Sequence, residues 1–294
     1  MVENEFDLEY LETVTYKIFK EMTLDISGKT DEIPKAVILG GQSGAGKTIL
    51  QEIFAQGIQN IIIINGDEFR KYHPHYKELS AKYGKDSVKY TSEFSSQVTN
   101  RLIKLISDER YNILIEGTLR TSQVPLDTCK NLKKKGYYTI LGIMAVKPEI
   151  SFLSTIARYE MMLFSGDIPR ATPKEHHDAI VKMLPCNLEE NWLSRQFDNI
   201  FIFNRQKRIL YNMNDSVFSS TPRDIISRVL NGEWTEQEIE EFISIGNSIV
   251  ELKTARVADD LQEFQEKYFN KSIINDLKSR KEGNSIDTFE NLLT

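Results

Sequence analysis

The chain has 294 residues, 40% of them hydrophobic and 27% charged, which is ordinary for a soluble globular protein with a buried core. Its net charge of −6 argues against a role in coating nucleic acid, because phosphate binding needs a basic face. Two cysteines fit a reducing cytoplasm, residues 1–12 lack the apolar stretch of a signal peptide, and no apolar run is long enough to span a membrane.

Apolar residues at helical spacing predict a first helix over residues 7–22. Further along the chain, short apolar runs without alternation predict buried strands at residues 35–40, 61–64, 112–116, 137–146 and 199–203. Helical patterns follow or separate these strands, at residues 47–57, 87–108, 122–135, 149–164 and 173–184. Because strand and helix alternate, we predict an α/β fold with a mostly parallel sheet flanked by helices.

The strand signals stop after Gly232. Thr235 and Glu238 form a capping-box pattern, and a long helical pattern follows to about residue 268. Residues 279–294 are polar and are expected to form a frayed tail. We therefore predict a catalytic domain over residues 1–232 and a helical extension with a polar tail over residues 233–294.

A complete P-loop pattern lies between the first predicted strand and the next helix. Its glycines allow successive backbone N–H groups to point at phosphate oxygens, and the helix N-terminus adds positive potential. Lys47 is expected to reach the β- and γ-phosphates, and Thr48 to offer its hydroxyl to Mg²⁺. The pattern predicts a nucleoside triphosphate site in a P-loop kinase fold, formed by Gly41, Gln42, Ser43, Gly44, Ala45, Gly46, Lys47 and Thr48.

Asp67 follows the second predicted strand. We expect that strand to neighbour the P-loop strand, and ligands bind at the carboxyl ends of parallel strands, so Asp67 is predicted to face the triphosphate. Asp67 could hold Mg²⁺ through water or accept the proton of an attacking hydroxyl. The alternative is a structural role as a helix N-cap.

Glu116 and Arg120 lie at the end of the third predicted strand, where they could grip hydroxyls or a phosphate of an acceptor. The alternative is a structural turn stabilised by Gly117.

Arg158 lies in a predicted helix, and Arg170 precedes a helix start in which Thr172 is the expected N-cap. The two arginines would flank a mobile lid and supply cations against the charge that develops during phosphoryl transfer. The alternative is that both are ordinary surface arginines on helices.

Several segments together resemble the zeta-type (Pez-type) toxins of bacterial toxin–antitoxin systems, and the resemblance covers roughly residues 35–235. They are residues 39–48 (LGGQSGAGKT), 66–79 (GDEFRKYHPHYKEL), 83–91 (YGKDSVKYT), 111–121 (YNILIEGTLRT), 147–160 (KPEISFLSTIARYE) and 170–178 (RATPKEHHD). The resemblance implies ATP-dependent phosphorylation of the sugar 3′-hydroxyl of UDP-N-acetylglucosamine, which blocks cell-wall precursor synthesis. It also implies a small helical antitoxin that covers the nucleotide site.

The resemblance assigns roles to individual residues. Asp67 corresponds to the base that activates the sugar hydroxyl, and Lys47 and Thr48 serve ATP and Mg²⁺. Arg158 and Arg170 correspond to residues that stabilise the transferring phosphoryl group. The residues that would line the UDP-sugar site are Glu116, Thr118, Arg120 and Thr128, together with Asn100 at a position where the family usually has a glutamate.

Asn100 keeps alternatives open, because asparagine retains hydrogen-bonding capacity but lacks the charge and one methylene of glutamate. One alternative is a P-loop kinase for another acceptor, such as a different nucleotide-sugar, a nucleoside, an antibiotic or a polynucleotide end. Another is a non-catalytic module that uses nucleotide binding as a switch. No counterpart in the family can be assigned to residues 236–294, and residues 236–268 could fold back to restrain the activity.

Overall fold

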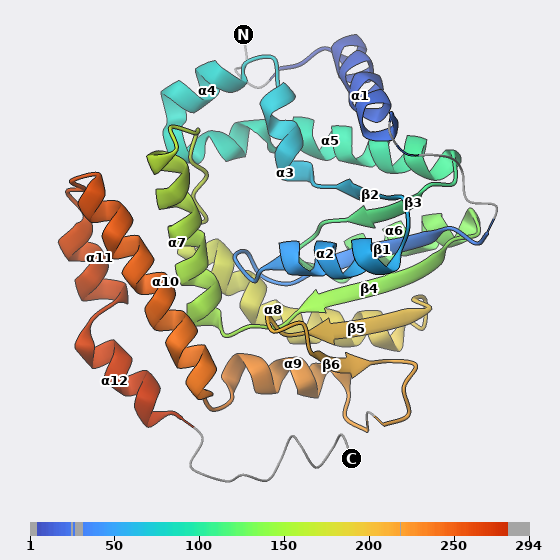
Figure 1. Ribbon diagram of the computed structural model, residues 1–294. Helices are drawn as coiled ribbons and strands as arrows, with labels where there is room; N and C mark the ends of the chain where they lie inside the picture. The colour runs from blue at the N-terminus through green and yellow to red at the C-terminus, as the bar shows by residue number, and fades with distance from the viewer. Residues whose placement is uncertain (1–4, 25, 27–31, 218, 282–294) are drawn as a thin grey trace.

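The computed structural model describes residues 5–24, 26, 32–217 and 219–281. A six-stranded sheet lies at its centre, in the order β2-β3-β1-β4-β5-β6 (Figure 1). All neighbouring strands are parallel except the last pair, in which β6 runs antiparallel to β5. The strands are β1 (Lys35–Gly40), β2 (Ile61–Ile64), β3 (Asn112–Ile115), β4 (Tyr138–Met144), β5 (Asn199–Phe203) and β6 (Ile209–Asn212).

Helices cover both faces of the sheet (Figure 1). Between the sheet strands run α2 (Lys47–Gly57), α5 (Ser87–Asp108), α6 (Gln123–Lys134), α7 (Pro148–Phe164) and α8 (Lys174–Leu193), and α1 (Leu8–Thr23) precedes them. Between β2 and α5 the chain forms short turns of helix, which are α3 (Gly66–Phe69), η1 (Arg70–Tyr72), α4 (Tyr76–Tyr83) and η2 (Gly84–Asp86). The chain continues after β6 with α9 (Pro222–Asn231), α10 (Glu236–Ala255), α11 (Leu261–Tyr268) and α12 (Lys271–Ser279).

Two hydrophobic clusters hold these layers together, one on each face of the sheet. Successive residues of a strand point to opposite faces, so Ile38 of β1 joins one cluster and Val37 joins the other. The first cluster contains residues of α1, α5, α6, α8 and α9, and the second contains residues of α2, α7 and the C-terminal helices. The inner strands β1, β3, β4 and β5 are therefore buried on both faces, which explains why their sequences show apolar runs rather than alternation.

The predicted α/β fold with a mostly parallel sheet is confirmed. The predicted bounds of β1, β2 and β5 match the structure residue for residue. One expectation about the arrangement was wrong, because β2 does not neighbour the P-loop strand. β3 lies between them and pairs with both. Apolar runs show that strands are buried but carry no information about their lateral order.

Two helices differ from their predictions. The helix predicted over residues 173–184 continues as α8 to Leu193, through Pro185, because residues beyond the proline such as Leu188 are packed in the core. Its N-cap is Pro173, without a side-chain cap, so the expected cap at Thr172 was wrong. Both differences reflect tertiary packing that outweighs local signals for starting and ending a helix.

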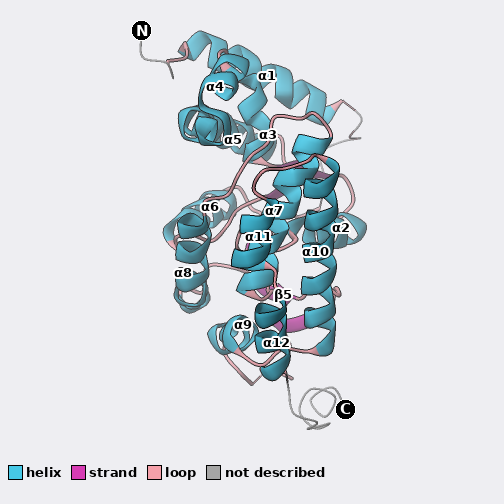
Figure 2. Ribbon diagram, turned by 90° about the vertical axis from the view of Figure 1, so that its left-hand side faces the viewer, coloured by secondary structure: helices cyan, strands magenta, loops and turns pink. Residues whose placement is uncertain are grey.

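The helical pattern predicted up to residue 268 is interrupted. α10 begins with the predicted capping box of Thr235 and Glu238, but it ends at Ala255, and Val257 takes a left-handed conformation with φ 52°. α11 and α12 then pack beside α10, which itself lies along α7 (Figure 2). The polar tail that was predicted beyond α12 lies almost entirely outside the described residues.

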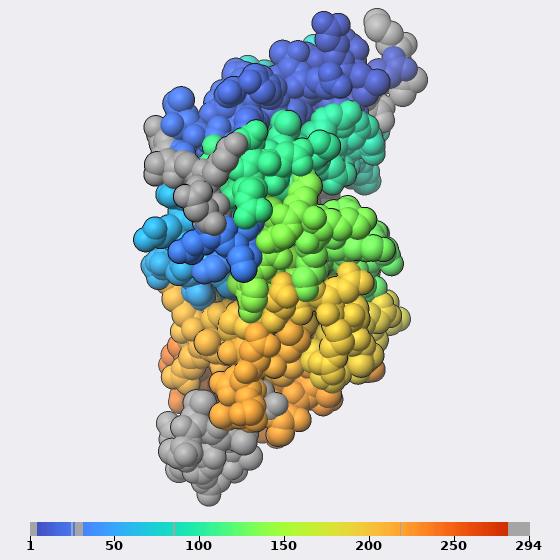
Figure 3. Space-filling model, turned by 90° about the vertical axis from the view of Figure 1, so that its right-hand side faces the viewer, coloured from blue at the N-terminus to red at the C-terminus, as the bar shows by residue number. Residues whose placement is uncertain are grey.

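The C-terminal helices share a core with the sheet. Trp234, Phe242 and Ile249 are buried in the same cluster as Val37 and Leu39 of the P-loop strand. The division into domains at residue 232 stays a prediction. Figure 3 shows the face at which the parallel strands begin, with the N-terminal helix at one end and the β5–β6 region at the other. Among the described residues, no helix is both long and apolar enough to cross a membrane.

Candidate active site

The P-loop has the geometry that its sequence predicts. It joins β1 to α2, whose N-cap is Gly46, and Gly44 and Gly46 take positive φ angles of 74° and 94°. A Cβ atom on Gly44 would lie 2.0 Å from the carbonyl oxygen of Ser151 in α7, so only glycine fits there. The loop is thus packed directly against α7.

Buried polar side chains hold this loop in place. Gln42 is fully buried and donates from Nε2 to the carbonyl oxygen of Val146 at 2.9 Å. The Lys47 ammonium donates to the carbonyl oxygens of Gly41 and Gln42, at 3.2 and 3.3 Å. Burial lowers the pKa of Lys47, and the nearby Glu116 carboxylate opposes that change.

A cavity of about 620 Å³ opens beside the loop, a volume suited to a nucleotide. Glu116, at the end of β3, lines it and is held by a hydrogen bond from Gln51 of α2 at 2.9 Å. The full lining among the described residues is Gly44, Gly46, Lys47, Thr48, Ile49, Glu116, Ser154, Arg158, Arg205, Gln206, Gln237 and Glu241. The cavity therefore combines the phosphate loop with side chains from α7, the β5–β6 loop and α10.

Arg158 of α7 is an exposed guanidinium at this cavity. It makes no hydrogen bond or ion pair with any residue that the structure describes. Burial of part of the side chain lowers the pKa of Arg158, and Arg170 lowers it further, whereas Asp67 and Glu116 raise it. A cation beside the phosphate loop without a protein anion is free to bind phosphate oxygens.

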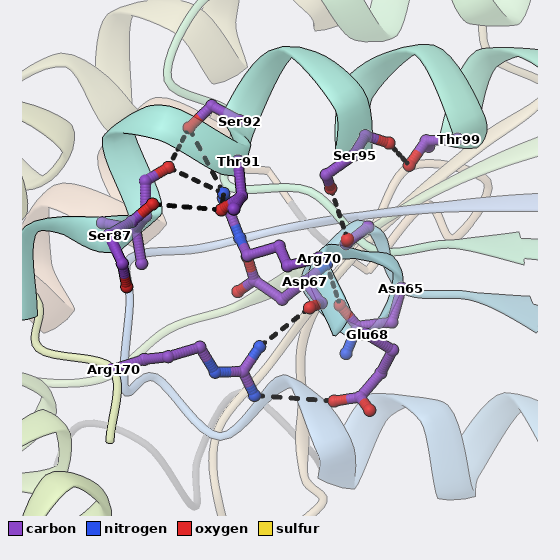
Figure 4. Close-up of polar contacts among 12 residues, drawn as sticks. Asn65, Asp67, Glu68, Arg70, Ser87, Thr91, Ser92, Ser95, Thr99 and Arg170 are labelled. Atoms are coloured by element: carbon purple, nitrogen blue, oxygen red, sulfur yellow. Dashed lines mark hydrogen bonds and ion pairs between the residues drawn. The ribbon is translucent and has the colours of Figure 1, made fainter. Parts of the chain in front are cut away.

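Asp67 lies in the single-turn helix α3 directly after β2 (Figure 4). The N-cap of that helix is Asn65, whose side chain accepts from the Asp67 backbone N–H, so the alternative in which Asp67 is itself the cap was wrong. The Asp67 carboxylate is half-exposed, and its Oδ1 accepts a hydrogen bond from Arg70 Nε at 2.8 Å. Its Oδ2 accepts no hydrogen bond from the described residues.

Cations surround this carboxylate. Desolvation alone would raise the pKa of Asp67, but Arg70, Arg170 and Arg158 outweigh it and hold the pKa below its ordinary value. Arg170 Nη1 donates to the Asp67 carbonyl oxygen at 2.9 Å, and its Nη2 lies 3.5 Å from Glu68 (Figure 4). Asp67 is therefore an ionised carboxylate at neutral pH, with one oxygen available to a hydroxyl proton.

Arg70 was not singled out by the sequence analysis, although it lies one helical turn after Asp67. Its guanidinium also donates to the Val88 carbonyl and to the hydroxyls of Thr91 and Ser92 in α5 (Figure 4). These contacts fix the arginine, and through it the orientation of the Asp67 carboxylate.

The residues predicted for the sugar-nucleotide side are more dispersed. Thr118 accepts from the Gly41 N–H through its carbonyl at 3.4 Å, and the Arg120 carbonyl accepts from Asn187 of α8. The Thr128 hydroxyl bonds the Val124 carbonyl within α6, and Asn100 is exposed in α5. Of the sugar-side residues predicted, only Glu116 is among the described residues that line the cavity.

Arg205 and Glu241 were also missed. Arg205 follows the end of β5, so the rule that identified Asp67 and Glu116 could have identified it too. Glu241 carries no local signal, because its position depends on where α10 packs.

The family model described as zeta toxin matches residues 20–216, most of the chain. The chain belongs to the zeta toxin family. It is 44% identical to toxin PezT of Streptococcus pneumoniae over 220 residues, which cover 74% of this chain and 86% of PezT. It is 41% identical to toxin zeta of Streptococcus pyogenes over 214 residues, covering 72% of this chain and 74% of that toxin.

Solved structures agree with the zeta toxin fold. A structure from the PezAT toxin–antitoxin system of Streptococcus pneumoniae has a TM-score of 0.77 at 38% identity, covering 86% of this chain and all of that chain. Since residues 1–235 are only 80% of the 294 residues, this match extends past residue 235, so at least part of the C-terminal helical segment has a structural counterpart. The AvrRxo1-ORF1:ORF2 complex, at 14% identity and a TM-score of 0.54, shares the fold.

Proposed function

We propose that this zeta toxin family member is an ATP-dependent kinase that phosphorylates the sugar 3′-hydroxyl of UDP-N-acetylglucosamine in the cytoplasm. As a toxin it would block the synthesis of cell-wall precursors. The observation that carries the proposal is an ionised carboxylate, Asp67, among three arginines at the same sheet edge as a complete P-loop. Family membership and the resemblance of the acceptor-side segments support the choice of acceptor.

On the donor side, ATP would place its phosphates in the P-loop. The backbone N–H groups at the start of α2 and the Lys47 ammonium would bind the phosphate oxygens. Thr48 and Glu116 line the same cavity and carry hard oxygen atoms of the kind that Mg²⁺ prefers. A Mg²⁺ ion bound there would neutralise charge on the phosphates.

On the acceptor side, Asp67 would accept the proton of the sugar 3′-hydroxyl through its free oxygen. The hydroxyl oxygen forms a bond to the γ-phosphorus while the bond from that phosphorus to the β–γ bridging oxygen breaks, which leaves ADP. The proton resides on Asp67 until the product departs. The ordinary pKa of an aspartate is about 3.9. Because the pKa of Asp67 lies below that value, its carboxylate is ionised at neutral pH and can accept a proton.

Arg158 and Arg170 would stabilise the charge on the transferring phosphoryl group. Arg158 is suited to this because no described residue neutralises it. Arg170 is held by its hydrogen bond to the Asp67 carbonyl oxygen, which keeps its guanidinium charge beside the base.

We also propose that a small helical antitoxin is the protein partner of this chain. The support is the solved relative from the PezAT toxin–antitoxin system. Covering the nucleotide cavity would suffice to silence the enzyme, since phosphoryl transfer requires bound ATP.

The test is acceptor-dependent ADP release from ATP and Mg²⁺. The wild-type protein should release ADP only when UDP-N-acetylglucosamine is present, and Asp67→Asn should bind ATP but not turn over. Equal ADP release with and without acceptor would contradict the proposal. The exposed Asn100 favours a second candidate, a kinase for another acceptor, which a panel of other UDP-sugars and nucleosides would identify. ATP binding without turnover on any acceptor, unchanged in Asp67→Asn, would point to the non-catalytic module.

A further inference from the structure

Arg205 connects the phosphate-binding loop to the rest of the molecule. It lies in the loop after β5, and its largely buried guanidinium donates from Nε to the Ala45 carbonyl oxygen at 3.0 Å. Its Nη2 donates to the Gly44 carbonyl oxygen and, at 3.0 Å, to the Ser154 hydroxyl of α7. Arg205 thus binds two consecutive carbonyls of the P-loop from outside.

These carbonyl contacts determine where the loop N–H groups point. In a trans peptide the C=O and N–H bonds point in opposite directions. A carbonyl of Ala45 that faces Arg205 therefore turns the N–H of Gly46 to the other side of the loop. The Gly46 N–H has no acceptor among the described residues, so it is available to a phosphate oxygen.

Glu241 of α10 completes the arrangement. Its Oε1 lies 2.5 Å from Arg205 Nη1, and both side chains line the nucleotide cavity. With this pair, each of the three guanidinium nitrogens of Arg205 has a protein acceptor. Arg158 in the same cavity has no such acceptor among the described residues. Arg158 is therefore available to bind phosphate, whereas Arg205 is already bound to the P-loop and to Glu241.

We propose that Arg205 and Glu241 are positioning residues for the P-loop, through which the C-terminal helix α10 sets the affinity for nucleotide. Glu241 neutralises Arg205 and orients its planar guanidinium, and Arg205 holds the Gly44 and Ala45 carbonyls outward so that the loop is preorganised before nucleotide arrives. This rests on the proposed ATP-binding function and extends it to a helix outside the P-loop itself.

The test compares Glu241→Gln and Arg205→Lys with Glu240→Gln, a neighbouring exposed glutamate of α10. ATP binding in the presence of Mg²⁺ is measured by calorimetry without acceptor, together with thermal stability and the KM values for ATP and acceptor. We expect both test variants to weaken ATP binding about tenfold, because a charge-assisted bond is lost in one and the bidentate geometry in the other. Glu241→Asp should recover part of the lost ATP affinity. The KM for acceptor should be unchanged in both test variants, and Glu240→Gln should bind ATP as tightly as the wild-type protein.

A change below twofold in ATP affinity for both test variants would overturn the proposal. So would a lowered melting temperature with unchanged ATP affinity, which would indicate a purely structural pair, or an equal loss in Glu240→Gln. Wild-type protein that binds ATP but phosphorylates no UDP-N-acetylglucosamine would overturn only the proposed acceptor. Failure of the wild-type protein to bind ATP would overturn both.

Discussion

A buried ion pair between α7 and α10 yields the sharpest stability prediction. The Lys253 ammonium lies 2.8 Å from Glu160 Oε1, and both side chains are only 2% exposed. Lys253 also contacts Asp260 at 2.7 Å, and Arg256 contacts the other Glu160 oxygen at 2.7 Å. The change to make is Lys253→Met, which keeps an unbranched side chain only one atom shorter and removes its charge.

This substitution leaves the Glu160 carboxylate buried with one partner instead of two. Removal of one member of a buried pair costs about 3–5 kcal/mol, and we expect the lower end because Arg256 remains. The entropy of unfolding for a chain of this length is about 0.6 kcal/mol/K, so a loss of about 3 kcal/mol lowers the melting temperature by about 5 °C. Urea unfolding followed by tryptophan fluorescence measures the loss directly.

Two further variants sharpen the test. In the double variant Glu160→Met with Lys253→Met, the remaining Arg256 and Asp260 are partly exposed and can be hydrated, so the double change should cost less than Lys253→Met alone. Lys207→Met breaks a surface pair with Glu52, exposed by 50% and 54%, and should cost less than about 1 kcal/mol. Additive losses in the double variant, or a Lys253→Met loss no larger than that of Lys207→Met, would refute the reasoning.

Further predictions concern the site. Because Arg70 helps to hold the pKa of Asp67 below its ordinary value, the activity should persist as pH falls until Asp67 is protonated. Arg70→Gln should raise that pKa and move the acidic limb of the kcat/KM profile to higher pH, and an unmoved limb would count against this role. Arg158→Lys should lower kcat by about tenfold or more with little change in ATP affinity, as single-turnover kinetics would show; unchanged kcat would exclude transition-state contact. Gly44→Ala should abolish ATP binding in calorimetry, because its Cβ would meet the Ser151 carbonyl, whereas Gly57→Ala, whose Cβ would have no atom of another element within 4 Å, should bind ATP normally.

Local patterns in the sequence were sufficient for much of this protein. The apolar runs placed β1, β2 and β5, and the glycine spacing placed the phosphate loop between β1 and α2. Asp67 was found from its position after a buried strand. These features depend on a few neighbouring residues, so their physical causes, which are side-chain periodicity, glycine conformations and strand ends, are all present in a short window of sequence.

Only the tertiary structure decided which of these segments meet. It placed β3 between β2 and β1, carried α8 through Pro185, and brought Glu241 to Arg205 across 36 residues of chain. Each of these results depends on the packing of distant apolar faces and on partners for buried charges, which no short window contains. The P-loop could therefore be predicted from eight residues of sequence. The contacts through which Arg205 and Glu241 hold it in shape could be identified only from the folded structure.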